Sequence, residues 1–173
     1  NVVPDILVLG KALGGGILPI AAVLAKPELD VAADYALGHY THEKNPVTSQ
    51  AALTTIDIIK DENLAENAAE LGDYALKCLN QLKAVHPVIG DVRGRGFLIG
   101  VELVQERKSK TPAADLAEDV FYRCLDRGLS FKVTMGNVLT LTPPLILSRE
   151  QMNFALEAID ACLGEAEEAF SLS

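Results

Sequence analysis

Basic residues are scarce in this sequence of 173 residues, with 15 lysines and arginines against 24 aspartates and glutamates and a formal net charge of −9. Binding to the phosphate backbone of a nucleic acid needs clustered basic side chains, so this balance argues against a nucleic-acid-binding protein. Long apolar runs are also lacking. No stretch reaches the roughly 18 residues of a membrane-spanning helix, and no basic segment precedes an apolar one at the N-terminus. We therefore expect no membrane association.

Cysteine is rare as well, occurring only at Cys78, Cys124 and Cys162. The count is odd, the spacing is wide, and each cysteine lies inside a helical pattern, which argues against a disulfide framework or a zinc site. We expect three small core residues in a reducing compartment, and therefore a cytoplasmic protein.

The sequence opens without a methionine and runs at once into the apolar stretch 5–9, which is typical of a buried central strand in a parallel sheet. Such a strand needs neighbours on both edges and cover on both faces, so we interpret the sequence as a fragment. The order of the elements predicts an α/β protein. We expect the tail of a large α/β domain over 1–60 and a smaller α/β domain over 61–173.

Local patterns predict the individual elements. The first part of the chain is expected to form strands at 5–9 and 18–25, a short helix from Pro27, a loop at 38–46, and helices at 48–61 and onward to 85. The middle is expected to form a glycine-spaced strand entry at 93–96, a strand from 97 to 104, a charged loop at 105–112 and a helix at 113–127. Strands at 129–133 and 138–142 follow, and then a last helix from Ser148, capped with Gln151.

The clearest chemical signal is Lys11, which directly follows the first apolar run and precedes Gly14, Gly15 and Gly16. The carboxyl end of a strand in an α/β sheet is where ligands bind. Burial there would disfavour the charged amine and leave a nucleophile able to form an imine with an aldehyde. A surface lysine in a flexible loop is the alternative. The glycine spacing matches neither a P-loop nor a dinucleotide-binding motif.

Four segments together resemble the class III family of pyridoxal-phosphate (PLP) aminotransferases, in the family's order and spacing over essentially the whole chain. They read PDILVLGKALGGGILPIAAVLA from Pro4, GHYTHEKNPVTSQAAL from Gly38, IGDVRGRGFLIGVELV from Ile89 and LTPPLILSREQ from Leu141. The resemblance implies PLP-dependent transferase fold type I, with pyridoxal 5'-phosphate as the cofactor. It is strongest to the branch of 2,2-dialkylglycine decarboxylase and 4-aminobutyrate aminotransferase.

By this resemblance, Lys11 is the catalytic and cofactor-binding residue, because it forms the Schiff base and shuttles the proton. Thr41 stands where the family has a threonine that binds the cofactor phosphate of the neighbouring subunit, which implies a homodimer with shared active sites. Without the resemblance, the alternative interpretation of Thr41 is a turn hydroxyl bonded to local backbone. We interpret His39, His42 and His86 as hydrogen-bonded structural residues.

One position departs from the family. Many relatives have a carboxylate-binding arginine three residues before the Pro-Pro pair, and this sequence has Thr140 there, which offers a hydroxyl but no charge. Thr140 is therefore the candidate substrate-binding residue. Either Lys132 or an arginine from the missing region supplies the cation, or the carboxylate of the substrate is held differently or absent. Arg93 and Arg95 are expected to be mainly structural. Asp5 lies too close to Lys11 to serve as the family's pyridinium-binding aspartate.

The predicted function of the full-length protein is transfer of an amino group from an amine or amino acid, for example the ω-amino acid 4-aminobutyrate, to a 2-oxo acid. A decarboxylase of the 2,2-dialkylglycine type or a racemase is the alternative, since the outcome depends on which bond of the substrate α-carbon stands perpendicular to the cofactor ring. A non-enzymatic α/β binding module is disfavoured because it has no use for a buried amine. The fragment alone is expected to be inactive.

Overall fold

The computed structural model describes residues 2–32, 34–35, 38 and 40–170, and the chain divides into two compact units, Asn1–Asn63 and Leu64–Ser173. The division expected at residues 60 and 61 concerns domains of a longer protein and stays a prediction. Within the described residues, no helix is long and apolar enough to cross a membrane.

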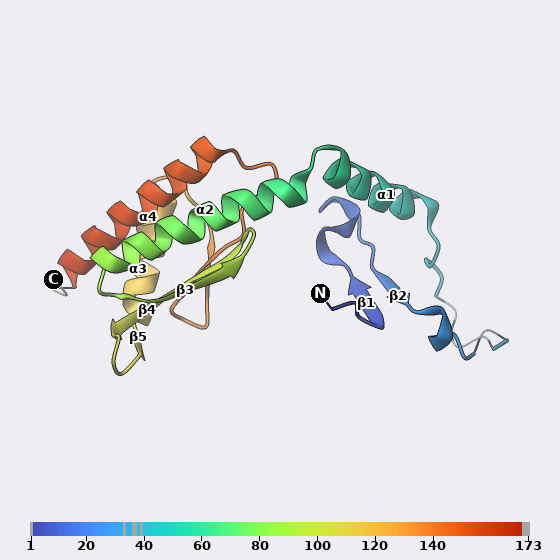
Figure 1. The fold of residues 1–173 in the computed structure, drawn as a ribbon, viewed down its shortest axis with the longest axis horizontal. Helices are drawn as coiled ribbons and strands as arrows, with labels where there is room; N and C mark the ends of the chain where they lie inside the picture. Colours follow the sequence, from blue (N-terminus) through green and yellow to red (C-terminus); the bar gives the residue numbers. More distant parts are fainter. Residues whose placement is uncertain (1, 33, 36–37, 39, 171–173) are drawn as a thin grey trace. The chain divides into compact units, whose positions relative to one another are not determined.

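The first unit is built on an antiparallel pair of strands, β1 (Ile6–Leu9) and β2 (Ala22–Ala25), joined through the 3-10 helix η1 (Lys11–Gly14) (Figure 1). The burial expected for the stretch 5–9 concerns the whole protein and stays a prediction; in this chain Ile6 and Val8 are 54% and 70% exposed. The strand expected there is antiparallel, not parallel, to its neighbour in this unit. The reason lies in η1, which reverses the chain, whereas a parallel neighbour needs a crossover connection. A second 3-10 helix, η2 (Pro27–Leu29), follows β2.

Two boundaries in this unit differ from the expected ones. Strand β2 begins at Ala22 rather than at residue 18, because the Leu18 amide donates to the Gly14 carbonyl (3.2 Å) and stays in the turn. The next residue, Pro19, has no N–H for a ladder. Helix α1 (Pro46–Asp61) begins two residues before Thr48 because the Asn45 side chain caps it, accepting from the Val47 amide at 2.9 Å.

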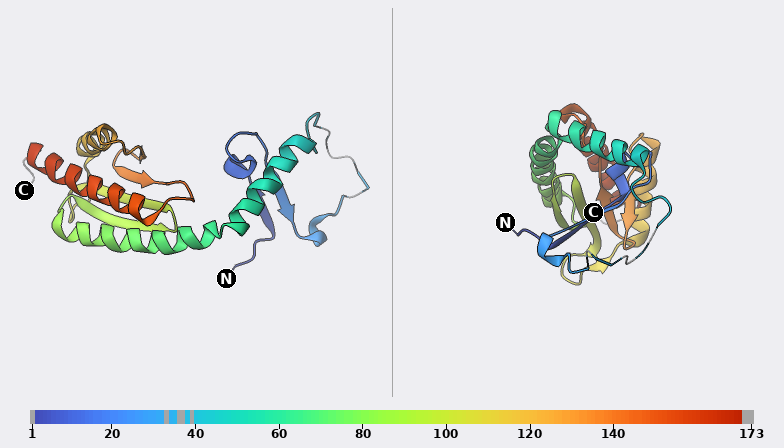
Figure 2. Two further views of the ribbon diagram at one scale, coloured as in Figure 1. Left: turned by 90° about the horizontal axis from the view of Figure 1, so that it is seen from above. Right: turned by 90° about the vertical axis from the view of Figure 1, so that its right-hand side faces the viewer.

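The second unit is a five-stranded antiparallel sheet of order β3-β4-β7-β6, with β5 paired to β4. Figure 2 shows this sheet with its helices on one side. Helices α2 and α3 contact the sheet, and α4 packs against both of them. The elements are α2 (Leu64–Val85), β3 (Ile89–Arg95), β4 (Leu98–Glu106), β5 (Thr111–Pro112), α3 (Ala114–Asp126), β6 (Lys132–Thr134), β7 (Val138–Leu141) and α4 (Arg149–Ala169).

The expected elements of this unit are present, with small shifts. The loop expected at 105–112 instead contains the end of β4 and all of β5, because Glu106 and Thr111 pair across a short reversal. Strand β6 begins three residues later than expected. The predicted start of the last helix is confirmed. The Ser148 side chain accepts from the Gln151 amide at 3.2 Å, and the Gln151 side chain accepts from the Ser148 amide at 3.0 Å.

Alternation along β4 separates the two faces of the sheet. Ile99, Val101 and Leu103 are buried beneath the helices, whereas Leu98 is 65% exposed on the other face. The core joins residues from the sheet and all three helices. Its largest fully buried side chains are Leu79, Val88, Ile89, Ile99, Val101, Leu103, Val104, Leu116, Val120, Leu139, Ile159 and Leu163. The open face of the sheet is therefore free to carry polar side chains.

Candidate active site

Lys11 lies where β1 gives way to η1, directly after Gly10. Its φ is +50°, a left-handed conformation that is uncommon for a residue with a side chain and costs roughly 1 kcal/mol or more. Its side chain takes part in none of the ion pairs of the described residues, and the residue is exposed. Lys11 thus presents a primary amine on a turn whose backbone is held in an uncommon conformation.

The burial expected for the Lys11 amine concerns the whole protein and stays a prediction; in this chain the residue is exposed. Within its unit, η1 packs against α1, and the side of the turn that carries Lys11 is exposed. The contact with α1 is close: Gly15 has φ +72°, and a Cβ there would stand 3.3 Å from the Thr55 hydroxyl oxygen of α1. Glycine is therefore required at this position both for its conformation and for the approach to α1.

The other candidates of the first unit lie in a turn. Thr41 and His42 are exposed between Tyr40 and Glu43, whose amide donates to the Tyr40 carbonyl at 3.0 Å. Among the described residues, neither the Thr41 hydroxyl nor the His42 ring makes a hydrogen bond. The interpretation of Thr41 as a locally bonded turn hydroxyl thus finds no partner there. His39 lies outside the described residues.

Asp5 is engaged elsewhere. Its carboxylate forms an ion pair with Lys26, with an Oδ1–Nζ distance of 2.5 Å, across the first strand pair. This pairing is consistent with leaving Asp5 out of the candidate site.

Thr140 lies on the open face of the sheet, in the middle of a row of directly paired residues. Arg93 of β3 pairs with Gly100 of β4, Gly100 with Thr140 of β7, and Thr140 with Lys132 of β6. Directly paired residues point to the same face of a sheet. Gly100 contributes no side chain, and a hollow of about 430 Å³ lies over it, lined partly by Arg93, Arg95 and Thr140. The fold thus brings together four residues that are far apart in the sequence.

The charges along this row are not equivalent. The Arg93 guanidinium donates to Asp91 at 2.9 Å and to Glu102 at 2.6 Å. Its hydrogen bond lowers the pKa of the Asp91 carboxyl from the ordinary value. Arg95 and Lys132 take part in no ion pair of the described residues. Arg93 is therefore neutralised, as a structural role requires, and Arg95 and Lys132 are the cations available to an anion.

The Thr140 hydroxyl has one partner within the protein, the Thr134 hydroxyl at 2.7 Å. A hydroxyl can donate one hydrogen bond and accept two, so Thr140 keeps further hydrogen-bonding capacity toward the hollow.

Other residues noted in the sequence are structural. Cys124 and Cys162 are buried free thiols and Cys78 is partly buried; burial also raises the pKa of the Cys124 thiol. The His86 ring is hydrogen-bonded as expected, to Asp160 and Glu167 of α4. Within the described part of the chain, no group of three His, Cys, Asp or Glu side chains could hold a metal ion.

Sequence reasoning missed the partners of His86. Asp160 and Glu167 are seven residues apart, so they lie two helical turns apart on one face of α4, and this spacing was a readable signal. It also missed Arg107, which donates to the backbone carbonyls of Lys83, His86 and Ile89 and so holds the end of α2 to β3. Nothing in the local sequence around Arg107 indicates those partners.

The residues of the first unit fit a phosphorylated aldehyde. The exposed amine of Lys11 can condense with a carbonyl carbon, and the open side of the glycine turn leaves space beside it, since a Cβ at Gly16 would meet nothing within 4 Å. The Thr41 hydroxyl is a donor suited to a phosphate oxygen.

Comparisons with known proteins identify the family. The family model of class-III aminotransferases matches residues 1–163. The chain is 48% identical over 165 residues to an (R)-1-hydroxy-2-aminoethylphosphonate ammonia-lyase of Vibrio splendidus, covering 95% of this chain and 34% of that protein. It is 41% identical over 169 residues to a leucine/methionine racemase of Thermococcus litoralis, covering 97% of this chain and 38% of that protein.

A solved structure confirms the fold. An amine transaminase from an uncultivated Pseudomonas species, in its PLP-bound form, matches 94% of this chain and 39% of its own with a TM-score of 0.86 and 29% identity. The expected α/β architecture, PLP-dependent transferase fold type I, is thereby confirmed, and so is PLP as the cofactor of the family. The chain spans about a third of the length of the curated relatives it matches. With its residues 1–163 matched and its fold shared, the chain belongs to the class-III aminotransferase family.

Proposed function

We propose that the full-length protein is a PLP-dependent aminotransferase in which Lys11 attaches the cofactor. The observation that carries the proposal is the position of Lys11, between β1 and a glycine-rich turn, in a chain of this family. When bound, the cofactor supplies an aldehyde that condenses with amines and a ring that draws electrons from the substrate α-carbon. The amino donor is an amine or amino acid and the acceptor a 2-oxo acid; 4-aminobutyrate is one candidate donor.

Two residues of the first unit have distinct roles in this proposal. Lys11 Nζ would hold the cofactor through its aldehyde carbon, C4′, and, once displaced by the substrate amine, would carry a proton from the substrate α-carbon to C4′. The Thr41 hydroxyl donates a hydrogen bond to a phosphate oxygen of the cofactor held by the neighbouring subunit. The active form is therefore a homodimer.

The open face of the second unit supports a role in substrate selection. Thr140 lacks the charge that an arginine would give, and Lys132 is its direct cross-strand neighbour without an ion pair of its own among the described residues. We assign to the Thr140 hydroxyl a hydrogen bond with an acidic group of the substrate. The Lys132 ammonium neutralises the negative charge of that group. This pair offers one point charge and one hydroxyl in place of a bidentate guanidinium.

Cofactor attachment can be tested in the full-length protein by borohydride reduction in the presence of PLP, followed by peptide mass mapping. The cofactor mass is expected on Lys11. Lys11→Ala should remove that label and lower kcat by about 10²-fold or more, because the nucleophile and the proton carrier are lost together. Lys44→Ala is the matched control, since Lys44 is also exposed and has a positive φ of 59°. A label that persists in Lys11→Ala would contradict the assignment.

A second candidate is elimination of ammonia from an aminoalkylphosphonate. The observation in its favour is the 48% identity to an ammonia-lyase of that kind, against 41% for the racemase. Two cations without an ion pair among the described residues suit a doubly charged phosphonate: Arg95, which lines the Gly100 hollow, and Lys132, which pairs across the sheet with Thr140. Incubating the full-length protein with (R)-1-hydroxy-2-aminoethylphosphonate and no 2-oxo acid separates the functions: a lyase releases ammonia over many turnovers, whereas an aminotransferase stops after one.

A further inference from the structure

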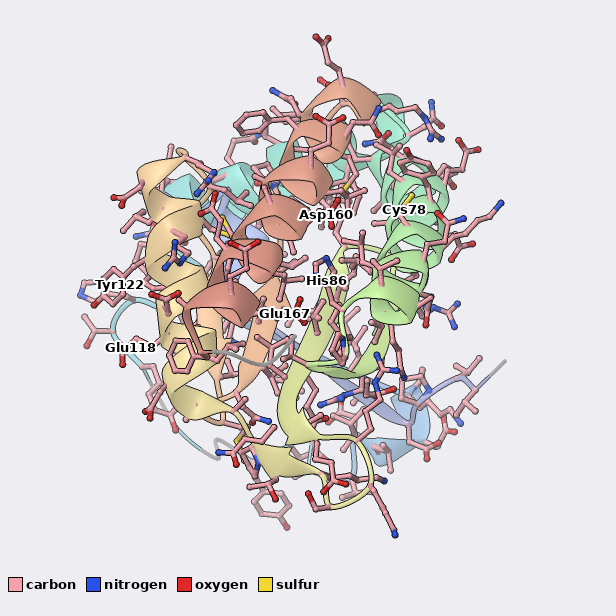
Figure 3. The ribbon with its side chains drawn as sticks, turned by 90° about the vertical axis from the view of Figure 1, so that its left-hand side faces the viewer. Cys78, His86, Glu118, Tyr122, Asp160 and Glu167 are labelled. Atoms are coloured by element: carbon pink, nitrogen blue, oxygen red, sulfur yellow. The ribbon has the colours of Figure 1, made fainter. Side chains whose placement is uncertain are left out.

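His86 is held between two carboxylates of α4. Its Nδ1 lies 2.7 Å from Glu167 Oε2, and its Nε2 lies 2.7 Å from Asp160 Oδ1. Figure 3 shows the imidazole at the end of α2, with Asp160 and Glu167 reaching it from α4. His86 is 7% exposed and Glu167 is 8% exposed, so both residues are shielded from water.

These two distances determine which protonation state the site prefers. A carboxylate only accepts hydrogen bonds, so each short N–O contact needs an N–H on the imidazole. Neutral imidazole carries one N–H, and its second nitrogen would then place a lone pair against a carboxylate oxygen. Both contacts are satisfied together only when the ring carries two protons and a positive charge.

The surroundings decide whether that charge is retained. Burial disfavours the charged ring, but the hydrogen bonds and negative charges of Asp160 and Glu167 outweigh it, so the pKa of His86 is raised above its ordinary value. The cations of this corner act elsewhere: Arg107 donates to the His86 carbonyl at 2.8 Å, and Lys83 of α2 lies 3.9 Å from Asp91. On the far side of α4, Glu165 is bound by Arg123 and Arg127.

The contacts of the charged His86 ring connect three parts of the chain: α2, α4 and the residue before β3. Glu167 Oε1 also accepts from the backbone amide of Val88 at 3.4 Å, so one carboxylate joins the His86 ring to the first residues before β3. We propose that His86, Asp160 and Glu167 form a proton-held clasp, in which a doubly protonated imidazole fastens the C-terminal half of α4 to the corner between α2 and β3, and which loosens when that proton is lost.

The clasp gives stability a definite dependence on pH. Because the pKa of His86 is higher in the folded chain than in the unfolded chain, the contribution is fully present below the unfolded value of 6.5 and is lost as the pH rises through the folded value. The apolar contacts of Ile159, Cys162 and Leu163 persist at high pH, so α4 is loosened rather than released.

Thermal unfolding of the whole chain, followed by circular dichroism between about pH 6 and pH 9, measures this loss. We expect the midpoint of the wild-type chain to fall by about 5 °C more than that of His86→Gln over this range. His42→Gln, which changes an exposed histidine, should behave as wild type. Identical pH dependence in wild type and His86→Gln would overturn the proposal.

Asp160→Asn separates the clasp from a general effect of packing. Asp160 is about half exposed, so the variant should fold, and its amide can donate to the lone pair of a neutral imidazole. We expect its pH dependence to be reduced toward that of His86→Gln. A nitrogen-15 NMR titration gives an independent check, because both ring nitrogens of His86 should stay protonated to a higher pH in the folded chain than in the urea-unfolded chain. Loss of the proton at the same or a lower pH in the folded chain would also overturn the proposal.

Discussion

Replacing Gly72 with alanine should destabilise the second unit although alanine is the better helix former. Gly72 is buried in the middle of α2, where the helix touches the turn between β3 and β4. A Cβ at this position would stand 2.3 Å from the carbonyl oxygen of Gly96, 2.5 Å from its carbonyl carbon and 2.6 Å from its Cα. All three atoms are backbone, so no side-chain rotation relieves the overlap.

The expected magnitude is the difference between two effects. Alanine in a helix interior gains about 1 kcal/mol over glycine. Inserting a methyl group into a packed interior costs about 1–3 kcal/mol and occasionally more, and a rigid 2.3 Å overlap lies at the upper end of that range. The net loss should therefore be about 1–2 kcal/mol, which lowers the unfolding midpoint by about 4–8 °C per kcal/mol in a domain of this size.

Urea unfolding of the whole chain, followed by circular dichroism, would measure this loss. Gly164→Ala is the matched control, because Gly164 is also helical and a Cβ there would lie 3.9 Å from the nearest side-chain atom, Cε1 of His86. The control should gain about 0.5–1 kcal/mol from helix propensity alone. If Gly72→Ala were as stabilising as Gly164→Ala, the close packing of α2 on this turn would be refuted.

Three further predictions concern the cap of α4, the substrate and the assembly. Ser148→Ala should cost about 1 kcal/mol of unfolding free energy in the same urea experiment, because the Gln151 amide loses its acceptor. Thr140→Arg in the full-length protein should improve kcat/KM for amino acids relative to plain amines, since a bidentate carboxylate pair contributes about 1.5–3 kcal/mol; an unchanged ratio would mean that the cation comes from elsewhere. Mixing Lys11→Ala subunits with Thr41→Ala subunits should restore about half the activity per heterodimer, because one site is then intact, and no recovery despite subunit exchange would refute the shared site.

Where short-range chemistry decides, the sequence alone was sufficient. The Ser148–Gln151 capping box forms between residues three apart, so the start of α4 could be predicted from them. Lys11 stands out because it falls between an apolar strand and a run of glycines. The alternation over 98–103 also determines which residues of that stretch face the helices, because successive side chains of a strand point to opposite faces.

Only the tertiary structure decided which distant segments of the chain pair or pack with each other. Alternation along 98–103 says nothing about which strands pair with β4, so the row from Arg93 through Gly100 and Thr140 to Lys132 could not be foreseen. Apolar character in the stretch 5–9 likewise does not specify direction, and η1 made β1 and β2 antiparallel. His86 meets Asp160 and Glu167 only because α4 packs against α2, and the free energy of those contacts depends on burial that no local pattern encodes.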